Sequence, residues 1–121
     1  MKKILVLGGT GFLGQHVVRL LKEKKYEVFS LSRREKVDIR IQEDFSKKLK
    51  EINPDVIINC VAHVGSVHYV TQYAADVIDD NMRIVLSIYR SVQASCPKVK
   101  IINPISNCSY PGEANIHYEP D

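Results

Sequence analysis

Four glycines stand close together near the start of the chain, directly after a short apolar run. Ile4 to Leu7 is typical of a strand, Gly8-Gly-Thr-Gly-Phe-Leu-Gly14 of a turn, and about Phe12 to Lys24 of a helix with apolar positions at helical spacing. Glycines permit a tight turn and a close approach of backbone, and the first N–H groups of the helix face any bound anion. Glycine clusters also form ordinary turns, but the flanking strand and helix favour a site for the pyrophosphate of a dinucleotide. The residues expected to form this site are Gly8, Gly9, Thr10, Gly11, Phe12, Leu13 and Gly14.

Two arginines follow the next expected strand, which spans Tyr26 to Leu31. Chains that bind NAD usually place an acidic residue about 20 residues beyond the glycines, where it accepts a hydrogen bond from the ribose 2′-hydroxyl. This chain has Ser32-Arg33-Arg34 instead. A guanidinium can hold a 2′-phosphate with paired hydrogen bonds, whereas a carboxylate would repel it. The pattern predicts NADP rather than NAD, with Arg33 and Arg34 at the phosphate; the alternative is a pair of surface arginines beside Glu35.

A carboxylate and an aromatic residue, Asp44 and Phe45, follow a short third strand expected from Val37 to Ile41. A carboxylate at this edge can accept a hydrogen bond from the amino group of adenine while the next side chain packs against the ring. Asp44 can also cap a helix beginning at Phe45 or Ser46, a common role for aspartate. The two roles are compatible, and we predict the adenine contact.

Small residues follow the fourth expected strand, Asp55 to Val61, whose nearly continuous apolar run is typical of a central strand in a parallel sheet. Val61, Ala62 and Val64 would let the cofactor backbone lie close to the sheet. His63, between them, is expected to be a loop histidine rather than a catalytic residue.

Asn81 lies on the apolar face of the longest expected helix, which runs from about Val70 to Ser95. An unsatisfied buried polar group costs about 1–3 kcal/mol, so this amide needs partners. We predict that Asn81 lies beside the cofactor and braces neighbouring backbone or holds a water. The alternative is an asparagine at the edge of an interface.

A serine, a cysteine and a tyrosine follow the fifth expected strand, Val99 to Ile102. A hydroxyl at Ser106 would face the nicotinamide and hydrogen-bond a substrate oxygen. A thiol at Cys108, with a reference pKa of about 8.5, is able to move a proton. From the residues alone, the segment that ends at Tyr110 is equally typical of an ordinary turn.

Strands and helices alternate along the chain, which predicts a single α/β domain over residues 1–121. The expected fold is a Rossmann-type doubly wound parallel sheet with strand order 3-2-1-4-5. Ligands of such sheets bind at the carboxyl ends of the strands, and the candidate residues above all follow such ends.

Composition and charge exclude several other classes of protein. The 121 residues are 45% hydrophobic and 26% charged with net charge +3, as in an ordinary globular domain, and the basic residues form no nucleic-acid stripe. The first apolar run is shorter than the ~7–15 residues of a signal peptide, and none reaches the ~18 of a membrane span. Cys60, Cys96 and Cys108 show no metal spacing. We expect reduced thiols, no metal and a cytoplasmic protein that binds neither nucleic acid nor membrane.

These motifs together resemble the extended short-chain dehydrogenase/reductase family, the NAD-dependent epimerases and dehydratases of nucleotide sugars. The glycine turn, Pro54 to Ala62, and Ser106-x-Cys108-x-Tyr110-Pro111 carry the resemblance. Val61 to Gly65, and Tyr73 to Asp76 before Asn81, are similar to the GDP-L-fucose synthase branch.

The resemblance implies an NADP-dependent epimerase/reductase of a keto-deoxy-sugar nucleotide, such as GDP-4-keto-6-deoxy-mannose. By position it implies Ser106 as the catalytic serine and Cys108 as the cysteine of epimerisation. It also implies a nucleotide-sugar substrate for the full-length protein.

The chain departs from the family in three places. His63 stands where the branch tends to carry lysine, and Asn107 replaces a usual serine. The family's proton donor is a tyrosine four residues before a lysine, and no tyrosine of this sequence has lysine at that spacing. We therefore expect the NADP-binding portion of a longer enzyme, inactive by itself.

Two other interpretations use the same glycine turn: a non-catalytic NAD(P)-binding or sensor module, and an interaction domain. The apolar face of the longest helix and the edge strand from Val99 to Ile102 favour association with another chain. Because the family commonly dimerises through this region, we expect a homodimer or a higher oligomer.

Overall fold

The computed structural model describes residues 2–32 and 35–105, and within them one parallel sheet is formed. Its strands are β1 (Lys3–Leu7), β2 (Glu27–Leu31), β3 (Val56–Asn59) and β4 (Lys100–Ile102), in the order β2-β1-β3-β4. All three neighbouring pairs are parallel. The predicted doubly wound fold is confirmed, and the strands present keep the predicted order.

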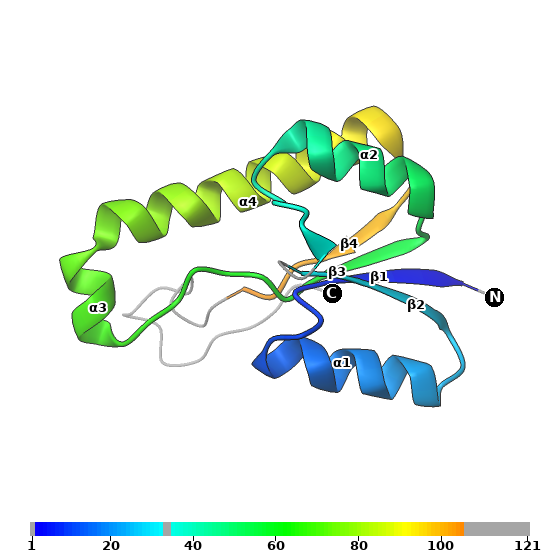
Figure 1. The fold of residues 1–121 in the computed structure, drawn as a ribbon, viewed down its shortest axis with the longest axis horizontal. Coiled ribbons are helices and arrows are strands. Elements are labelled where there is room, and N and C mark those ends of the chain that lie inside the picture. Colours follow the sequence, from blue (N-terminus) through cyan, green and yellow to red (C-terminus); the bar gives the residue numbers. More distant parts are fainter. Residues whose placement is uncertain (1, 33–34, 106–121) are drawn as a thin grey trace, which may run out of the picture.

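Helices cover both faces of the sheet (Figure 1). On one face lies α1 (Phe12–Glu23), and on the other lie α2 (Gln42–Ile52) and α4 (Ala74–Ser95). The short helix α3 (Val67–Gln72) precedes α4. Right-handed crossovers explain this arrangement, because α1 leads away from β1 in one direction and α4 leads away from β3 in the other. The chain therefore diverges at the carboxyl ends of β1 and β3.

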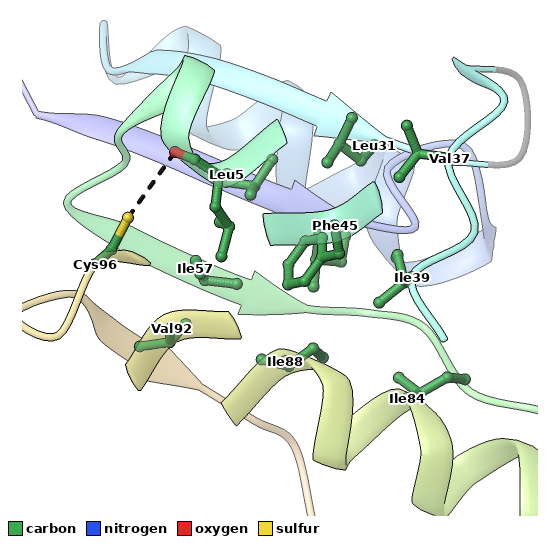
Figure 2. Close-up of a cluster of buried hydrophobic side chains, with 12 residues drawn as sticks. Leu5, Leu31, Val37, Ile39, Phe45, Ile57, Ile84, Ile88, Val92 and Cys96 are labelled. Atoms are coloured by element: carbon green, nitrogen blue, oxygen red, sulfur yellow. Dashed lines mark hydrogen bonds between the residues drawn. The ribbon is translucent and has the colours of Figure 1, made fainter. Parts of the chain in front are cut away.

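The main hydrophobic core lies between the sheet and the pair α2 and α4 (Figure 2). Side chains alternate along a strand, so Leu5 and Leu7 of β1 share one face, and Leu5 stands in register with Ile57 of β3. Phe45 and Leu49 of α2 are fully buried against this face. Cys96, just after α4, donates its S–H to the Leu49 carbonyl at 3.9 Å between sulfur and oxygen.

The prediction of a strand from Val37 to Ile41 is wrong, because these residues form a turn. Val37 and Ile39 are both buried, and this alternation is what resembled a strand. Asp38 bends the chain: its carbonyl accepts from the Ile41 N–H at 3.0 Å, and its carboxylate accepts from the Arg40 N–H at 3.0 Å.

The single helix expected from Val70 to Ser95 is two helices that meet at Tyr73. The Tyr73 backbone leaves helical geometry, with φ −115° and ψ 35°. Ser66 caps the short first helix by accepting the Tyr69 N–H at 3.1 Å. The predicted end at Ser95 is confirmed.

Truncation of the core leucine Leu49 should destabilise the fold far more than truncation of an exposed leucine. Leu49→Ala removes a fully buried side chain and is expected to lower the free energy of unfolding by about 2–5 kcal/mol. Leu20→Ala on α1, where the side chain is 52% exposed, is the matched control and should cost less than about 1 kcal/mol. Urea denaturation measures both, and equal losses would contradict the described core.

Candidate functional site

The glycine turn joins the carboxyl end of β1 to the start of α1. Gly8 adopts φ +76°, a left-handed conformation that glycine adopts without strain. Its N–H donates to the Leu31 carbonyl at 2.8 Å, and its own carbonyl accepts from the Gly11 N–H at 3.0 Å. The turn is therefore tied both to the end of β2 and to itself.

Two glycines of this turn stand where a side chain has no room. A Cβ added to Gly14 would overlap the Gly8 carbonyl, and one added to Gly9 would overlap the Ser30 hydroxyl. At Gly11 an added Cβ would make an ordinary contact, 3.4 Å from the Gly8 oxygen. Gly9 and Gly14 thus bring α1 against the sheet, while Gly11 faces outward.

The start of α1 suits an anion. Gly11 is the N-cap, no side chain of the described residues caps the helix, and its first turn carries no acidic residue. The first N–H groups of a helix have no partner within the helix, and the helix dipole places partial positive charge there. This end of α1 is thus available to hold a phosphate group.

A cavity of about 610 Å³ lies beside this turn, at the carboxyl ends of β1, β2 and β3. We call this cavity the cofactor cleft, after the ligand predicted from the sequence. Three segments and one residue of α4 form its walls: Gly8, Thr10 and Gly11; Ser32 and Lys36 to Arg40; Cys60 to Ala62; and Ile84.

The cleft brings together only some of the residues predicted from sequence. Five line it: Gly8, Thr10, Gly11, Val61 and Ala62. Five others are placed outside its lining: Gly9, Phe12, Leu13, Gly14 and Val64. Of these, the glycines pack α1 on the sheet, whereas the three apolar side chains are exposed. Cofactor contact stays a prediction for all ten.

The structure contradicts the adenine contact predicted for Phe45, because its side chain has no exposed surface. Asp44 is exposed in the first turn of α2, outside the cleft lining, and the N-cap of that helix is Ile41. Asp44 therefore stabilises the helix dipole rather than capping the helix. The pair that does line the cleft is Asp38-Ile39, six residues earlier.

Four candidate residues, Arg33, Arg34, Ser106 and Cys108, lie outside the described residues. Their neighbours Ser32 and Glu35 are described. The Glu35 carboxylate accepts from the Ser32 N–H at 2.6 Å and from its hydroxyl at 2.7 Å. This pair holds the chain just beyond β2 beside the cleft.

Asn81 braces backbone, as predicted. Its Oδ1 accepts from the His63 N–H at 2.8 Å, and its Nδ2 donates to the carbonyls of His63 at 3.0 Å and Val77 at 2.9 Å. Its whole amide is thus satisfied, and the loop after β3 is fastened to α4. Contact of Asn81 with a cofactor stays a prediction.

A chain of polar side chains that the sequence analysis missed runs beside the cleft. Arg40 donates to Asp38 and to Asp80, both at 2.8 Å. Asp80 lies 2.9 Å from His63 Nδ1, and His63 Nε2 lies 2.7 Å from the Tyr69 hydroxyl. The hydrogen bond from Arg40, and after it that from His63, holds the pKa of Asp80 below the usual carboxyl value. His63 is the predicted loop residue, but its ring is fixed by partners from two helices.

The two described cysteines are free thiols, as expected. Cys60 lines the cleft, and Cys96 borders a smaller cavity with Asn53, Pro54 and Asp55, at the opposite edge of the sheet. Burial raises the pKa of both thiols. No group of three or more potential metal ligands occurs among the described residues.

Comparison with family models shows which protein family the chain belongs to. The model of the NAD dependent epimerase/dehydratase family matches residues 4–121, almost the whole sequence. The chain belongs to this family. The resemblance noted from the glycine turn and the segment before Ala62 is thereby confirmed.

Relatives within the family are longer proteins. GDP-L-fucose synthase of Azorhizobium caulinodans is 26% identical over 110 residues, covering 91% of this chain and 35% of that protein. GDP-6-deoxy-D-talose 4-dehydrogenase of Aggregatibacter actinomycetemcomitans is 38% identical over 61 residues, covering 50% of this chain and 21% of that protein. The chain thus spans about a third of the length of the first of these relatives.

Solved structures share the fold. MlghC, a GDP-mannoheptose C4 reductase from Campylobacter jejuni solved with NADP bound, matches with a TM-score of 0.83 at 23% identity. The match covers 98% of this chain and 37% of that one. No helix within residues 2–32 and 35–105 combines the length and the apolar character needed to cross a bilayer.

Alanine at Gly14 should disturb the site far more than alanine at Gly11. The new methyl group of Gly14→Ala would meet the Gly8 carbonyl, and overpacking of this kind typically costs about 1–3 kcal/mol. Gly11→Ala has room and negative φ, so it should stay within about 1 kcal/mol of the unaltered chain. Thermal or urea unfolding of both variants checks this, and an undisturbed Gly14→Ala protein would show that α1 does not approach β1 as described.

Proposed function

We propose that this chain is the NADP-binding portion of a nucleotide-sugar epimerase/reductase. One observation carries the proposal: the glycine turn brings the uncapped start of α1 to a cavity at the carboxyl ends of β1 and β3. Such divergence points in doubly wound sheets bind dinucleotides. Membership of the epimerase/dehydratase family supports the same cofactor class.

The residues around the cleft fit this cofactor. The absence of side-chain space at Gly9 and Gly14 lets backbone N–H groups reach a pyrophosphate beside Gly8 and Gly11. Asp38 and Ile39 are the pair in this cleft suited to an adenine amino group and ring. Lys36 adds positive charge to the same wall, and Arg33 and Arg34 stay the predicted contacts of the 2′-phosphate.

The other end of the cleft, at Cys60 to Ala62, is where the nicotinamide would lie. When bound, NADPH would supply a hydride to a substrate carbonyl, and NADP⁺ would accept a hydride from a substrate alcohol in the reverse reaction. The part of this chain is to hold the cofactor, and we propose that Ser106 orients the substrate oxygen and Cys108 moves a proton. The relatives, a GDP-L-fucose synthase and a GDP-6-deoxy-D-talose 4-dehydrogenase by name, support a GDP-linked deoxy-sugar substrate for the complete protein.

The alternative is a non-catalytic NAD(P)-binding module of the same fold. Both functions share the cleft, so cofactor binding alone does not separate them. Turnover of a nucleotide keto-sugar by the complete protein, lost on Ser106→Ala, would favour the enzyme.

NADPH should bind more tightly than NADH, which calorimetric titration of both cofactors measures. Arg33→Ala should reduce the difference in affinity between NADPH and NADH, because it removes a predicted charge-assisted hydrogen bond to the 2′-phosphate. Such a bond is worth about 1.5–3 kcal/mol. Arg90→Ala, on the exposed side of α4 and outside the cleft lining, is the matched control and should leave both affinities unchanged. Equal or reversed affinities of the unaltered chain would contradict the choice of NADP.

The position of the cofactor is checked in the same titration by alkylation of the cysteines. Bound NADP should slow alkylation of Cys60, which lines the cleft, and leave Cys96 unchanged. Mass spectrometry of the peptides reports each thiol separately. Protection of Cys96 alone would place the ligand elsewhere.

We further propose that the chain associates with a second copy through α4. Apolar side chains exposed at intervals of three or four residues form a stripe on this helix: Ile78, Met82, Leu86 and Tyr89. Sedimentation over a range of concentrations should give a dimer, and Met82→Glu, which places a charge on the stripe, should shift it to monomer. A monomer at every concentration, before any substitution, would contradict the proposal.

A further inference from the structure

Two segments distant in the sequence form walls of the cofactor cleft. Lys36 to Arg40, the turn before α2, forms one wall, and Cys60 to Ala62, just after β3, forms the other. No strand of the described sheet includes the turn, so backbone pairing does not fix it against the second wall.

The Asp80 carboxylate on α4 contacts Arg40 in one wall and His63, the residue directly after the other wall, with one oxygen for each. Its Oδ1 accepts from Arg40 Nη1 at 2.8 Å, and its Oδ2 lies 2.9 Å from His63 Nδ1. Arg40 also binds Asp38 through Nε at 3.0 Å and Nη2 at 2.8 Å. The Asp80 carboxylate thus binds both the Arg40 guanidinium, which orders the first wall, and the imidazole of His63, the residue after the second wall.

The histidine has partners on both ring nitrogens. With the proton on Nδ1 donated to Asp80, Nε2 is left to accept from the Tyr69 hydroxyl at 2.7 Å. Gly65 makes room for this contact, because a Cβ there would overlap the Tyr69 ring. The ring is therefore held in one orientation between α3 and α4.

Helix α4 is a rigid base for these contacts. Ile84, Ile88 and Val92 bury the helix in the core, and Asn81 fastens the His63 backbone. Asp80 and Asn81 are consecutive, so the side chain and the backbone of His63 are held from the same turn of helix. Asp80 also accepts a hydrogen bond from Arg40 in the other wall.

We propose that Asp80 is a positioning residue that sets the two walls of the cofactor cleft relative to each other. The proposal deepens the proposed function, since the ligand whose fit depends on this spacing is NADP. Asp80 is outside the cleft lining and acts through Arg40 and His63.

The next residue along the helix provides the contrast. Asp79 binds Arg83 one turn later at 2.9 Å, and both side chains are more than half exposed. Such exposed pairs within a helix contribute little. The Asp80 carboxylate is 26% exposed, and its partners lie 40 and 17 residues away in sequence.

Asp80→Asn should weaken NADPH binding by about 3- to 30-fold, the range typical of substitutions at residues that link separate sites. Asp79→Asn removes the same charge from the neighbouring position and should change affinity less than about twofold. Asp80→Glu, which keeps the charge, should recover most of the loss. Calorimetry gives the affinities, and the unfolding midpoint should be similar for the three variants.

Hydrogen exchange of the cofactor-free chain tests the coupling without relying on NADP. Asp80→Asn should speed amide exchange in residues 36–41 and 61–65 together, whereas Asp79→Asn should leave both segments unchanged. Unchanged exchange in Asp80→Asn, or equal effects of the two variants, would overturn the proposal. If the unaltered chain binds neither NADPH nor NADH, the proposed function fails, and the exchange result still decides the role of Asp80.

Discussion

The close approach of helix α1 to the end of strand β1 is the constraint on which the cleft depends. The backbone at Gly14 lies against Gly8 with no room for a Cβ, and Gly9 is equally tight against Ser30. These contacts aim the first N–H groups of α1 at the space beside the carboxyl ends of the strands. A side chain at either position would move the helix outward and turn its positive end away from the cleft.

The direction of the crossovers supplies the space that this helix end faces. From the centre of the sheet, α1 leads to β2 on one side and α4 leads to β4 on the other. Among the described residues, the segments that follow β1 and β3 lead away from each other, which leaves a gap between the ends of these two strands. The cavity is therefore a product of topology, whereas its chemical character comes from the glycine turn and the walls around it.

Local patterns predicted the sheet and the glycine turn well, because both depend on neighbours in sequence. The same dependence on local pattern produced the wrong strand at Val37 to Ile41. Val37 and Ile39 are buried alternately, as in a strand, but hydrogen bonding by the Asp38 side chain forms a turn there. Because a strand was expected there, the adenine contact was predicted for the residues after it, Asp44 and Phe45, and Phe45 packs in the core.

The role of Asn81 was predictable because a polar residue on an apolar helix face needs partners. The role of Asp80 was not, since nothing in the sequence around an aspartate on a helix indicates that an arginine 40 residues earlier will contact it. Nor did helical periodicity reveal the break at Tyr73, where the apolar pattern continues from one helix to the next.

The order of the strands bears on how the chain is made. Strand β1 precedes its two neighbours in the sequence, yet it lies between them, and one of those neighbours ends only at Asn59. During synthesis, this apolar strand keeps an open hydrogen-bonding edge until β3, which ends at Asn59, has been made, unless it is shielded meanwhile. Strands exposed in this way readily pair with other chains. The most buried strand of the finished sheet is thus the segment most in need of protection on the ribosome.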